Sequence, residues 1–519
     1  MKGIRLRQLI HNGVLVPEPY HPRGFRIFVG GKALRLSPLQ EEMAVAWVKK
    51  LGTDYVEDPV FKRNFFKDFC AVLGLGTDLK PEDFDFSEVI SHVDEERRAK
   101  EGMSREEKKR LREERKALRE ANQAKYGHAI VNGERVEVGN YAVEPSSIFM
   151  GRGKHPLRGR WKQGPRREDI ILNLSPDAPT PPGSWKEMVW DPDAMWIAKW
   201  RDKLTGKMKY IWLSDASPQK QLSDMEKFER ARQLHHTIDK VRLHILENLE
   251  STDVQRRKIA TVCYLIDALK LRVGDEKDKD EADTVGATTL RPEHIRIKPG
   301  NMVAFSFIGK DSVPWRKEVK LPDPVIRNLE EFMGAARSPI FKGVRSDNVS
   351  TFLAEAMPGL TAKVFRTYHA TRVVEEYLGN ATVCKDDPEY YKRHVATMAN
   401  LHAAITCNHK KKIPKRWSET LEKKRNRLKQ LREKKSTGRS KRYIEAYEKL
   451  KLRIELMKAT KDYNLRTSLK SYIDPRVYLK WGREVDYDWK LYYPRTLQKK
   501  FSWIEQPIKP LRVAEDIKA

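Results

Sequence analysis

The chain has 519 residues, of which 39% are hydrophobic and 12 are tryptophans, so it can form several folded units and is not a disordered basic tail. Its 102 lysines and arginines exceed its 73 acidic residues, which gives a formal net charge of +29 at pH 7. Such an excess favours DNA or RNA as a partner, because each neutralised phosphate releases condensed counterions, and leaves ribosomal or membrane-surface association as the alternative.

The N-terminal part of the chain predicts a compact mixed unit followed by a charged helix. Up to about residue 86, short apolar runs such as residues 25–29 alternate with stretches of helical periodicity. Ser104 then begins a capping box with Glu107, and a charged helix continues to a C-cap at Gly127. We expect this helix to be a solvated connector.

A glycine-rich basic loop and a hairpin come next. The loop spans residues 149–167, and glycines there let the backbone approach a phosphate closely while basic side chains neutralise it. The alternative is an ordinary mobile loop. Its basic residues are Arg152, Lys154, Arg158, Arg160, Lys162, Arg166 and Arg167. Residues 196–200 and 209–213 then predict a hairpin with basic residues on one face.

From about residue 223 the periodicity is mainly helical. Apolar residues at helical spacing predict a buried helix that delivers Arg272 at its C-terminal end, just before the helix breaker Gly274. These residues are Ile259, Val262, Ile266 and Leu269. Residues 303–308 and 315–321 predict two strands joined by a turn, which places Lys310 near the tip of a hairpin.

Two further helices are predicted before residue 410. One contains Val364, Phe365, Tyr368, Val374 and Leu378, and it carries Arg366 beside its apolar face. The other has an apolar stripe of Tyr391, Val395, Met398 and Ile405 and leads directly to His409.

Composition changes abruptly after His409. Residues 411–460 contain 19 Lys or Arg and only 6 Glu. Two helices joined by a tight turn at residues 436–438 are expected to form an antiparallel arm that projects from the body and lies over DNA. A dimerising coiled coil is the alternative, but each half is too short for sustained heptads. The apolar seam is formed by Leu421, Leu428, Leu431, Tyr443, Tyr447, Leu450 and Ile454.

Cysteine spacing and hydropathy bear on the setting of the protein. Cys70, Cys263, Cys384 and Cys407 form no C-x-x-C pair, which argues against a disulfide framework or a zinc ribbon and favours a reducing, intracellular environment. Residues 1–20 lack the apolar core of a signal peptide, and the chain has no run of 18 apolar residues. We therefore expect a soluble protein that is not exported.

Tyr472, in the short polar segment 471–476, is a candidate nucleophile toward a nucleic-acid phosphate. Such a reaction needs charge stabilisation on the nonbridging oxygens, in-line approach, and a proton for the departing sugar oxygen. Arginine suits the first task, because its fork binds phosphate bidentately, and lysine suits the last. Taken singly, each candidate residue has an ordinary explanation as a surface or packing residue.

Taken in order, the motifs of the chain resemble the eukaryotic-like type IB DNA topoisomerases, including their archaeal form, over nearly the whole length. The matching segments are residues 62–68, 271–277, 282–286, 309–312, 361–368, 407–409 and 472–476. They read KRNFFKD, LRVGDEK, ADTVG, GKDS, TAKVFRTY, CNH and YIDPR.

The resemblance implies the roles of five catalytic residues. Tyr472 would attack a DNA phosphate to give a 3′-phosphotyrosyl link and a free 5′-hydroxyl. Arg272, Arg366 and His409 would hold the nonbridging oxygens, and Lys310 would protonate the leaving oxygen. In this family the protein encircles duplex DNA as a clamp, and the cut strand rotates about the intact one, driven by torsional strain and without ATP.

The same resemblance assigns DNA contacts to Arg152, Lys154 and Lys209, and to Lys277 and Asp311 within the matching motifs. It implies no cofactor and no metal. In agreement, residues 309–310 do not form a P-loop, and no acidic cluster with metal-ligand spacing stands out. Ser471 and Met150 depart from the Asn and Arg common in eukaryotic relatives, so sensitivity to drugs that trap the cleaved complex is left open.

The expected fold class is a multidomain α+β protein that forms a DNA clamp. A mixed α/β N-terminal cap is expected over residues 1–222, and a mainly helical, tyrosine-recombinase-like catalytic domain with a small antiparallel sheet over residues 223–410. A basic helical-hairpin linker follows over residues 411–460, and a small C-terminal domain carries the nucleophile over residues 461–519. The expected partner is double-stranded DNA, with no membrane, and the expected state is a monomer.

Two other functions are alternatives to a topoisomerase. A tyrosine recombinase shares the tyrosine chemistry, but it usually has His three residues before the second arginine, where this chain has Lys363. A nonenzymatic nucleoid or RNA-binding protein would not need five catalytic residues together. Because the long charged N-terminal extension of the nuclear enzymes is missing, we expect a cytoplasmic, chromosome-associated protein in a prokaryotic, archaeal cell.

Overall fold

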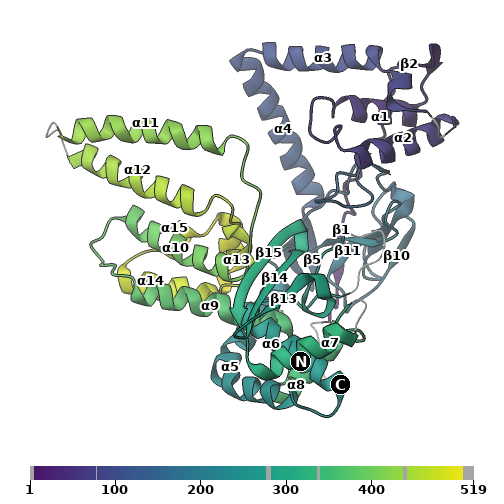
Figure 1. Ribbon diagram of the computed structural model, residues 1–519. Helices are drawn as coiled ribbons and strands as arrows, with labels where there is room; N and C mark the ends of the chain where they lie inside the picture. Colours follow the sequence, from purple (N-terminus) through teal and green to yellow (C-terminus); the bar gives the residue numbers. More distant parts are fainter. Residues whose placement is uncertain (1–4, 77–78, 276–281, 336–338, 437–440, 506–519) are drawn as a thin grey trace, which may run out of the picture. The chain divides into compact units, whose positions relative to one another are not determined.

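The computed structural model describes residues 5–76, 79–275, 282–335, 339–436 and 441–505. The described residues fall into two compact units. The N-terminal unit runs to Lys220 and includes Ala282, and the C-terminal unit comprises residues 221–275 and everything from Asp283 onward. Figure 1 labels the helices and strands of both units.

The N-terminal unit begins with an aromatic core. A three-stranded sheet in the order β3-β2-β4 packs with helices α1, α2 and α3 around stacked rings of Trp47, Phe65 and Phe69. Helix α2 starts with Pro59 after the N-cap Asp58 and ends at the left-handed Gly74, as helix-capping preferences dictate. The bounds are β2 Arg26–Val29, β3 Lys32–Arg35, β4 Phe84–Asp85, α1 Pro38–Val48, α2 Pro59–Leu73 and α3 Ser87–Gly102. The short apolar run at residues 25–29 contains strand β2.

The charged helix α4, Arg105–Tyr126, is also confirmed, with the Ser104–Glu107 capping box at its start and Gly127 at its end. It buries none of its residues, which fits a solvated connector. It leads to a second core between the sheets β1-β5-β6 and β10-β9-β11-β12. The bounds are β1 Leu9–His11, β5 His128–Val131, β6 Glu134–Glu137, β9 Ile170–Asn173, β10 Glu187–Val189, β11 Trp196–Arg201 and β12 Met208–Trp212. Strands β11 and β12 form the predicted hairpin.

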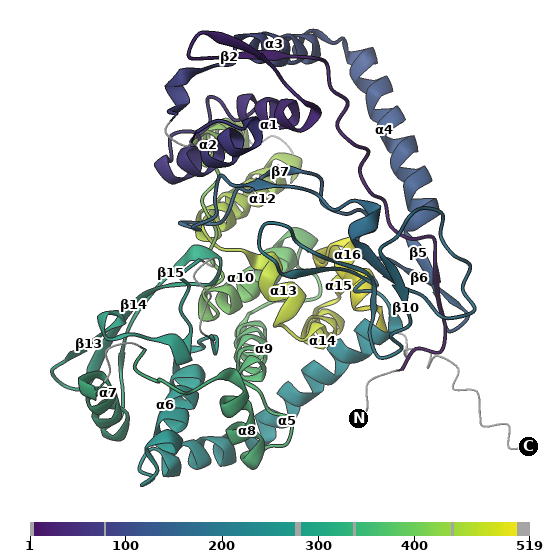
Figure 2. The same ribbon diagram turned by 90° about the vertical axis from the view of Figure 1, so that its right-hand side faces the viewer.

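The C-terminal unit has two hydrophobic cores. The first is built around the sheet β13-β14-β15 and the helices α5 to α9. Figure 2 shows this sheet next to α6 and α7. The bounds are α5 Pro218–Asn248, α6 Val254–Leu269, β13 Ile295–Lys298, β14 Met302–Gly309, β15 Val313–Lys320, α7 Asp323–Ala335, α8 Ser346–Ala356 and α9 Ala362–Asn380. The predicted helices and the β14–β15 hairpin are all present.

A second core of this unit joins α9 to the helices that precede and follow Tyr472. Its largest side chains are aromatic, and Tyr478 and Tyr493 are almost completely buried. The bounds are α10 Glu389–Thr406, α13 Leu465–Ser471, α14 Pro475–Val485, α15 Trp489–Tyr492 and α16 Arg495–Lys500. Through this core the segment that carries Tyr472 packs directly on the helix that carries Arg366.

The basic arm consists of α11, Trp417–Ser436, and α12, Lys441–Ala459, which pack side by side (Figure 1). Leu421 and Ile454 are buried in the predicted seam, whereas the other seam residues are only partly buried. Helix α12 also packs along α10, with Lys449 Nζ 5.9 Å from the centre of the Tyr390 ring. The arm therefore lies against the body for the length of α12, and residues 437–438 of the predicted turn lie outside the described residues.

The two ends of the arm are fastened together at its base. Lys411 N donates to Asp462 O (2.8 Å), and Asn464 N donates to His409 O (2.6 Å). Lys410 Nζ makes an ion pair with Asp462 at 2.9 Å. We call this group, residues 409–411 with 462–464, the clasp.

The fold is thus a mixture of helices with five sheets of two to four strands among the described residues. This agrees with the predicted mixed α and β composition, whereas the boundaries between the four expected domains stay predictions. Within the described ranges, no helix is long and apolar enough to cross a membrane.

Candidate active site

Arg272 reaches the site through a backbone reversal after α6. The helix ends at Leu269, and Lys270 takes a left-handed conformation with φ of 59°, so Arg272 lies in an extended segment three residues beyond the helix. The sequence predicted Arg272 at the C-terminal end of the helix itself. Arg272 O accepts a hydrogen bond from Ala287 N at 2.9 Å, which holds the backbone of this segment.

Gly274 and Gly286 explain why the two motifs on either side of residue 280 belong together. A Cβ built on Gly286 would lie 2.5 Å from Gly274 Cα, and Gly274 has a φ of 79°. Only glycine permits so close a contact, because any side chain would overlap the opposite backbone. The motifs 271–275 and 282–286 are therefore two halves of one backbone contact that supports Arg272.

Lys310 lies at the tip of the β14–β15 hairpin. The last pair of the ladder is Gly309 with Val313, so Lys310 begins the short 3₁₀ turn Lys310–Ser312 between the strands. Its side chain is exposed. Asn408 Nδ2 donates to Pro314 O at 3.3 Å, and this bond ties the hairpin to the segment that carries His409. Asp311 follows Lys310 in the same turn.

Arg366 and His409 lie against each other inside the unit. The Arg366 side chain is buried on α9, and its Nη2 donates to Cys407 O (2.7 Å) and lies 3.2 Å from His409 Nε2. The turn after α10 passes through Asn408, which has a φ of 51° and so reverses the chain toward Arg366. Asparagine tolerates this left-handed conformation better than most residues do.

Tyr472 stands at the end of α13 and joins this group. Arg272 Nη1 donates to the Tyr472 hydroxyl at 3.2 Å. The Arg366 guanidinium lies 4.9 Å from the centre of the Tyr472 ring, and the His409 ring lies 5.0 Å from it. The structure thus brings four of the five predicted residues into direct contact, although they lie up to 200 positions apart in the sequence.

A cavity of about 100 Å³ is lined by four of the five candidates, and Tyr472, the fifth, contacts three of these four residues. Arg272, Lys310, Arg366 and His409 all face it, so Lys310 lies at the same site as the buried group. The cavity is small and polar. Because its walls supply cations and N–H donors, it suits a single anionic group such as a phosphate.

Burial and neighbouring positive charges keep His409 in its neutral form. Burial lowers its pKa to about 3, and the positive charges of Arg366 and Arg272 act in the same direction. At neutral pH the ring is therefore uncharged and has one N–H to donate. Among the described residues, the buried atoms Arg366 Nε and His409 Nδ1 have no hydrogen-bond partner. Buried polar groups normally find a partner, so these two atoms are candidate donors to a ligand of the site.

The predicted DNA contacts Arg152, Lys154 and Lys209 belong to the N-terminal unit. Arg152 and Lys154 are exposed in a turn-rich loop, and Lys209 is half-buried on β12, 4.0 Å from Glu144. Lys277 lies outside the described residues. No observation of the structure tests these contacts, which stay predictions.

Three cations of the same loop are engaged within the unit and are less suited to a phosphate. Arg158 pairs with Asp58 at 2.7 Å, and Arg160 pairs with Asp68 at 2.8 Å. Lys162 lies 3.0 Å from Asp202 and also contacts Glu144. The sequence could not separate these structural cations from the exposed ones, because their acidic partners lie from 18 to 100 positions away.

Sequence reasoning missed four polar residues that line the cavity, namely Lys270, Lys410, Asn464 and Thr467. Burial lowers the pKa of Lys270, as do the charges of Lys317 and Arg242, while Asp267 opposes the shift. Asn464 is the N-cap of α13 and accepts from Thr467 N, and an Asn before a short helix ending at Tyr472 was a signal for this role. Over the described ranges, no cluster of His, Cys, Asp and Glu suited to a metal is present.

Comparison with known proteins covers almost the entire chain. Residues 4–213 match the family model of the eukaryotic DNA topoisomerase I DNA binding fragment, and residues 216–442 match that of the eukaryotic DNA topoisomerase I catalytic core. Residues 444–510 match the C-terminal topoisomerase domain.

Curated relatives agree with these family models. DNA topoisomerase 1 beta of Arabidopsis thaliana is 35% identical over 96% of this chain and 58% of its own length. DNA topoisomerase 1 of Candidozyma auris is 37% identical over 82% of this chain and 58% of its own. DNA topoisomerase I, mitochondrial, of Rattus norvegicus is 34% identical over 96% of this chain and 91% of its own. The chain thus spans little more than half the length of some relatives and nearly all of others.

Proposed function

The chain belongs to the eukaryotic DNA topoisomerase I family, and from this premise we propose that it is a type IB DNA topoisomerase that relaxes positive and negative supercoils. The observation that carries the proposal is the group around Tyr472. Arg272 contacts its hydroxyl, and the buried atoms Arg366 Nε and His409 Nδ1 have no hydrogen-bond partner among the described residues. A nucleophile beside cationic and N–H donors suits an attack on a phosphodiester.

In the first step the Tyr472 oxygen attacks phosphorus, and the bond from phosphorus to the 5′ oxygen breaks. The Tyr472 hydroxyl releases its proton to water as it attacks, and Arg272, which donates to this oxygen at 3.2 Å, stabilises the negative charge that develops. Arg366 and neutral His409 donate to the nonbridging oxygens as negative charge develops on them. Lys310 gives a proton to the departing 5′ oxygen, which leaves a free hydroxyl and a 3′-phosphotyrosyl bond.

Religation reverses these events after the cut strand has rotated about the intact one. The 5′ hydroxyl attacks the phosphotyrosyl bond, and Lys310 takes back its proton. Because the phosphotyrosyl bond conserves the energy of the original phosphodiester, the cycle needs no ATP. We propose that side chains also replace a metal here, since Arg272, Arg366 and Lys310 supply the positive charge.

Relaxation of supercoiled plasmid without ATP and with EDTA tests this function. We expect wild type to relax both positively and negatively supercoiled plasmid, and Tyr472→Phe to relax neither, because the variant lacks the nucleophilic oxygen. Denaturing the reaction during turnover should leave protein on the 3′ end of the nick. Activity of the Phe variant, or protein recovered on the 5′ end, would contradict the proposal.

The finer predictions about partners belong to the same proposal. The double-stranded form of the DNA, the monomeric state and association with the chromosome are supported by the family resemblance alone. Light scattering of the protein with and without a short duplex tests the first two. A dimer that forms without DNA would contradict the monomer.

A tyrosine recombinase is the nearest other function. The presence of Lys363 three residues before Arg366 is the observation against it. Strand transfer between two separate duplexes would favour a recombinase, whereas relaxation of one plasmid favours the topoisomerase.

A further inference from the structure

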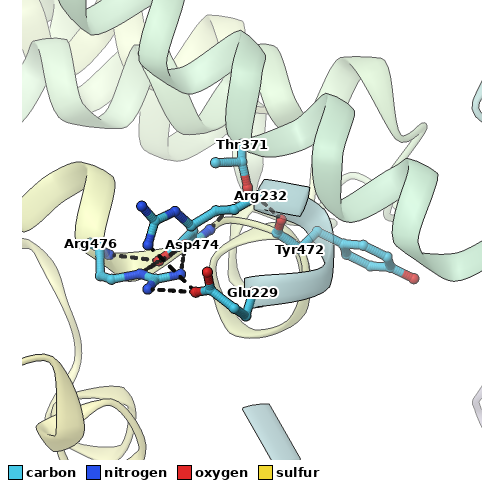
Figure 3. Close-up of polar contacts among 6 residues, drawn as sticks. All are labelled: Glu229, Arg232, Thr371, Tyr472, Asp474 and Arg476. Carbon is cyan, nitrogen blue, oxygen red and sulfur yellow. Dashed lines mark hydrogen bonds and ion pairs between the residues drawn. The ribbon is translucent and has the colours of Figure 1, made fainter. Parts of the chain in front are cut away.

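The backbone on either side of Tyr472 is held by one side chain from another helix. Thr371 of α9 donates through Oγ1 to Tyr472 O at 3.3 Å, and the same oxygen accepts from Asp474 N at 3.1 Å. Figure 3 shows Thr371 above the turn, with the Tyr472 ring pointing away from it. One hydroxyl therefore spans the three-residue turn that carries the nucleophile.

The two backbone groups that Thr371 binds lie at the ends of two helices, where peptide groups have no hydrogen-bond partner within the helix. Tyr472 is the C-cap of α13, whose last carbonyls cannot be satisfied within that helix. Asp474 is the N-cap of α14. By accepting from one and donating to the other, Thr371 joins the end of α13 to the start of α14 and fixes the angle between them.

The location of Thr371 on α9 connects this turn to the phosphate-binding side of the site. Arg366 lies five residues earlier on the same helix, about 7.5 Å along its axis. Because an α-helix is rigid over this distance, α9 sets the separation between the Arg366 guanidinium and the Tyr472 backbone. The Tyr472 ring is then placed 4.9 Å from that guanidinium.

A second anchor holds the far side of the turn. The buried Asp474 side chain makes an ion pair with Arg476 at 2.6 Å, and Arg476 reaches Glu229 of α5 at 3.2 Å (Figure 3). Burial tends to lower the pKa of Arg476, but the carboxylates of Asp474 and Glu229 outweigh it and raise the pKa. Glu229 also pairs with Arg232 at 3.5 Å. The turn is thus fixed from α9 on one side and from α5 on the other.

We propose that Thr371 is a positioning residue for the nucleophile, an inference that rests on the proposed topoisomerase function. Its hydroxyl holds the Tyr472 backbone so that the phenol oxygen meets phosphorus in line while Arg366 binds the nonbridging oxygens. A displacement of the reacting group of about 1 Å can reduce a rate on the order of a hundredfold. Loss of the hydroxyl should therefore slow cleavage and religation and leave DNA affinity unchanged.

Three variants separate positioning from packing. Thr371→Val keeps the shape and removes both hydrogen bonds, whereas Thr371→Ser keeps the hydroxyl. The matched control is Thr367→Val on the same helix, because the hydroxyl of the fully buried Thr367 donates at 3.3 Å to Lys363 O within α9. Thr371→Ala removes the hydroxyl without the second methyl group and provides an independent test if the valine variant does not fold.

Single-turnover cleavage of a short suicide duplex, religation to an added 5′-hydroxyl strand, duplex affinity and Tm are measured for each variant. We expect Thr371→Val to cleave and religate roughly ten- to a hundredfold more slowly, with Kd and Tm near wild type. Thr371→Ser and Thr367→Val should remain close to wild type. Unchanged rates in a folded Val or Ala variant, or equal losses in Ser and Val, would overturn the proposal. If wild type itself formed no adduct, the proposed function would fail instead.

Discussion

At the scale of single residues, the site combines permanent charge with one neutral ring. Burial, together with the positive charges of Arg366 and Arg272, keeps His409 uncharged. A neutral histidine adds a donor for a phosphate oxygen without adding a charge that would have to be desolvated. Because its pKa is lowered in the folded state, His409 destabilises that state at low pH.

We predict that the free energy of unfolding falls as the pH decreases below about 6.5, in part because of His409. The unfolded chain binds a proton there near its ordinary pKa of 6.5, whereas the folded chain does so only near 3. The unfolded state thus takes up more protons as pH falls, so this contribution is complete above 6.5 and is lost toward 3. Between pH 6.5 and 5 it amounts to about 2 kcal/mol at most.

Urea denaturation of wild type and His409→Asn at pH 7, 6 and 5 checks this prediction. The Asn variant should lose less stability than wild type over this range, whereas His21→Asn, at an exposed position, should follow wild type. Equal pH dependence in wild type and His409→Asn would show that His409 titrates alike in both states.

At the scale of elements, the clasp is what brings the arm back to the site. The backbone bonds of residues 409–411 with 462–464 are reinforced by the Lys410–Asp462 ion pair, and the pKa of Lys410 is raised mainly by its bond to Asp462. Asn464, which donates to His409 O, also caps the helix that ends at Tyr472. Two segments of the candidate site that the arm separates in sequence are therefore joined directly.

A double-mutant cycle on Lys410→Met and Asp462→Asn should give a coupling energy of about 0.2–1 kcal/mol, because the pair is only partly exposed and is supported by backbone bonds. Urea unfolding of the four proteins measures this coupling. The Arg327–Glu250 pair serves as the control, since its side chains are 63% and 64% exposed and should show no measurable coupling. Equal coupling in the two pairs would mean that the clasp adds nothing.

The helices and strands were largely predictable from the sequence, whereas the residues and elements that they contact were not. Capping residues and apolar periodicity located α4, α6, α9 and the β14–β15 hairpin, since these signals are local. The reversal at Lys270, the Gly274–Gly286 contact and the packing of α12 on α10 depend on residues distant in sequence. The five catalytic candidates were found through ordered motifs, and Thr371 was missed because its role lies in two backbone contacts about 100 positions away.

At the scale of the whole molecule, the net charge of +29 dominates the expected behaviour toward DNA. Some of the positively charged side chains form ion pairs within the protein, such as Arg158–Asp58 and Arg160–Asp68. Salt dependence therefore reports the cations that reach phosphates and not the total charge.

We predict that the affinity for a duplex falls steeply with salt, by about 10³–10⁵ between 50 and 200 mM if 6–10 phosphates are contacted. Replacing Arg152 and Lys154 by Gln should reduce the slope of log K against log salt by up to about 2, because each contact contributes about 0.9. Fluorescence anisotropy with an uncleavable duplex measures the slope.

The charge-matched control is Lys109→Gln with Lys116→Gln on α4, which removes two exposed cations from the solvated helix. We expect its slope to equal that of wild type. A flat salt response in wild type would argue against extensive phosphate contact, and equal slopes in the two double variants would remove Arg152 and Lys154 from the interface.

The clasp also bears on how this protein can change over evolution. Because residues 411 and 462 are hydrogen-bonded to each other, the geometry at His409 and Tyr472 is set before the chain enters the arm and after it returns. Beyond α12, which packs on α10, insertions or deletions toward the distal end need not move any atom of the candidate site. The arm is thus a region where selection can alter length and charge while the chemistry stays constant.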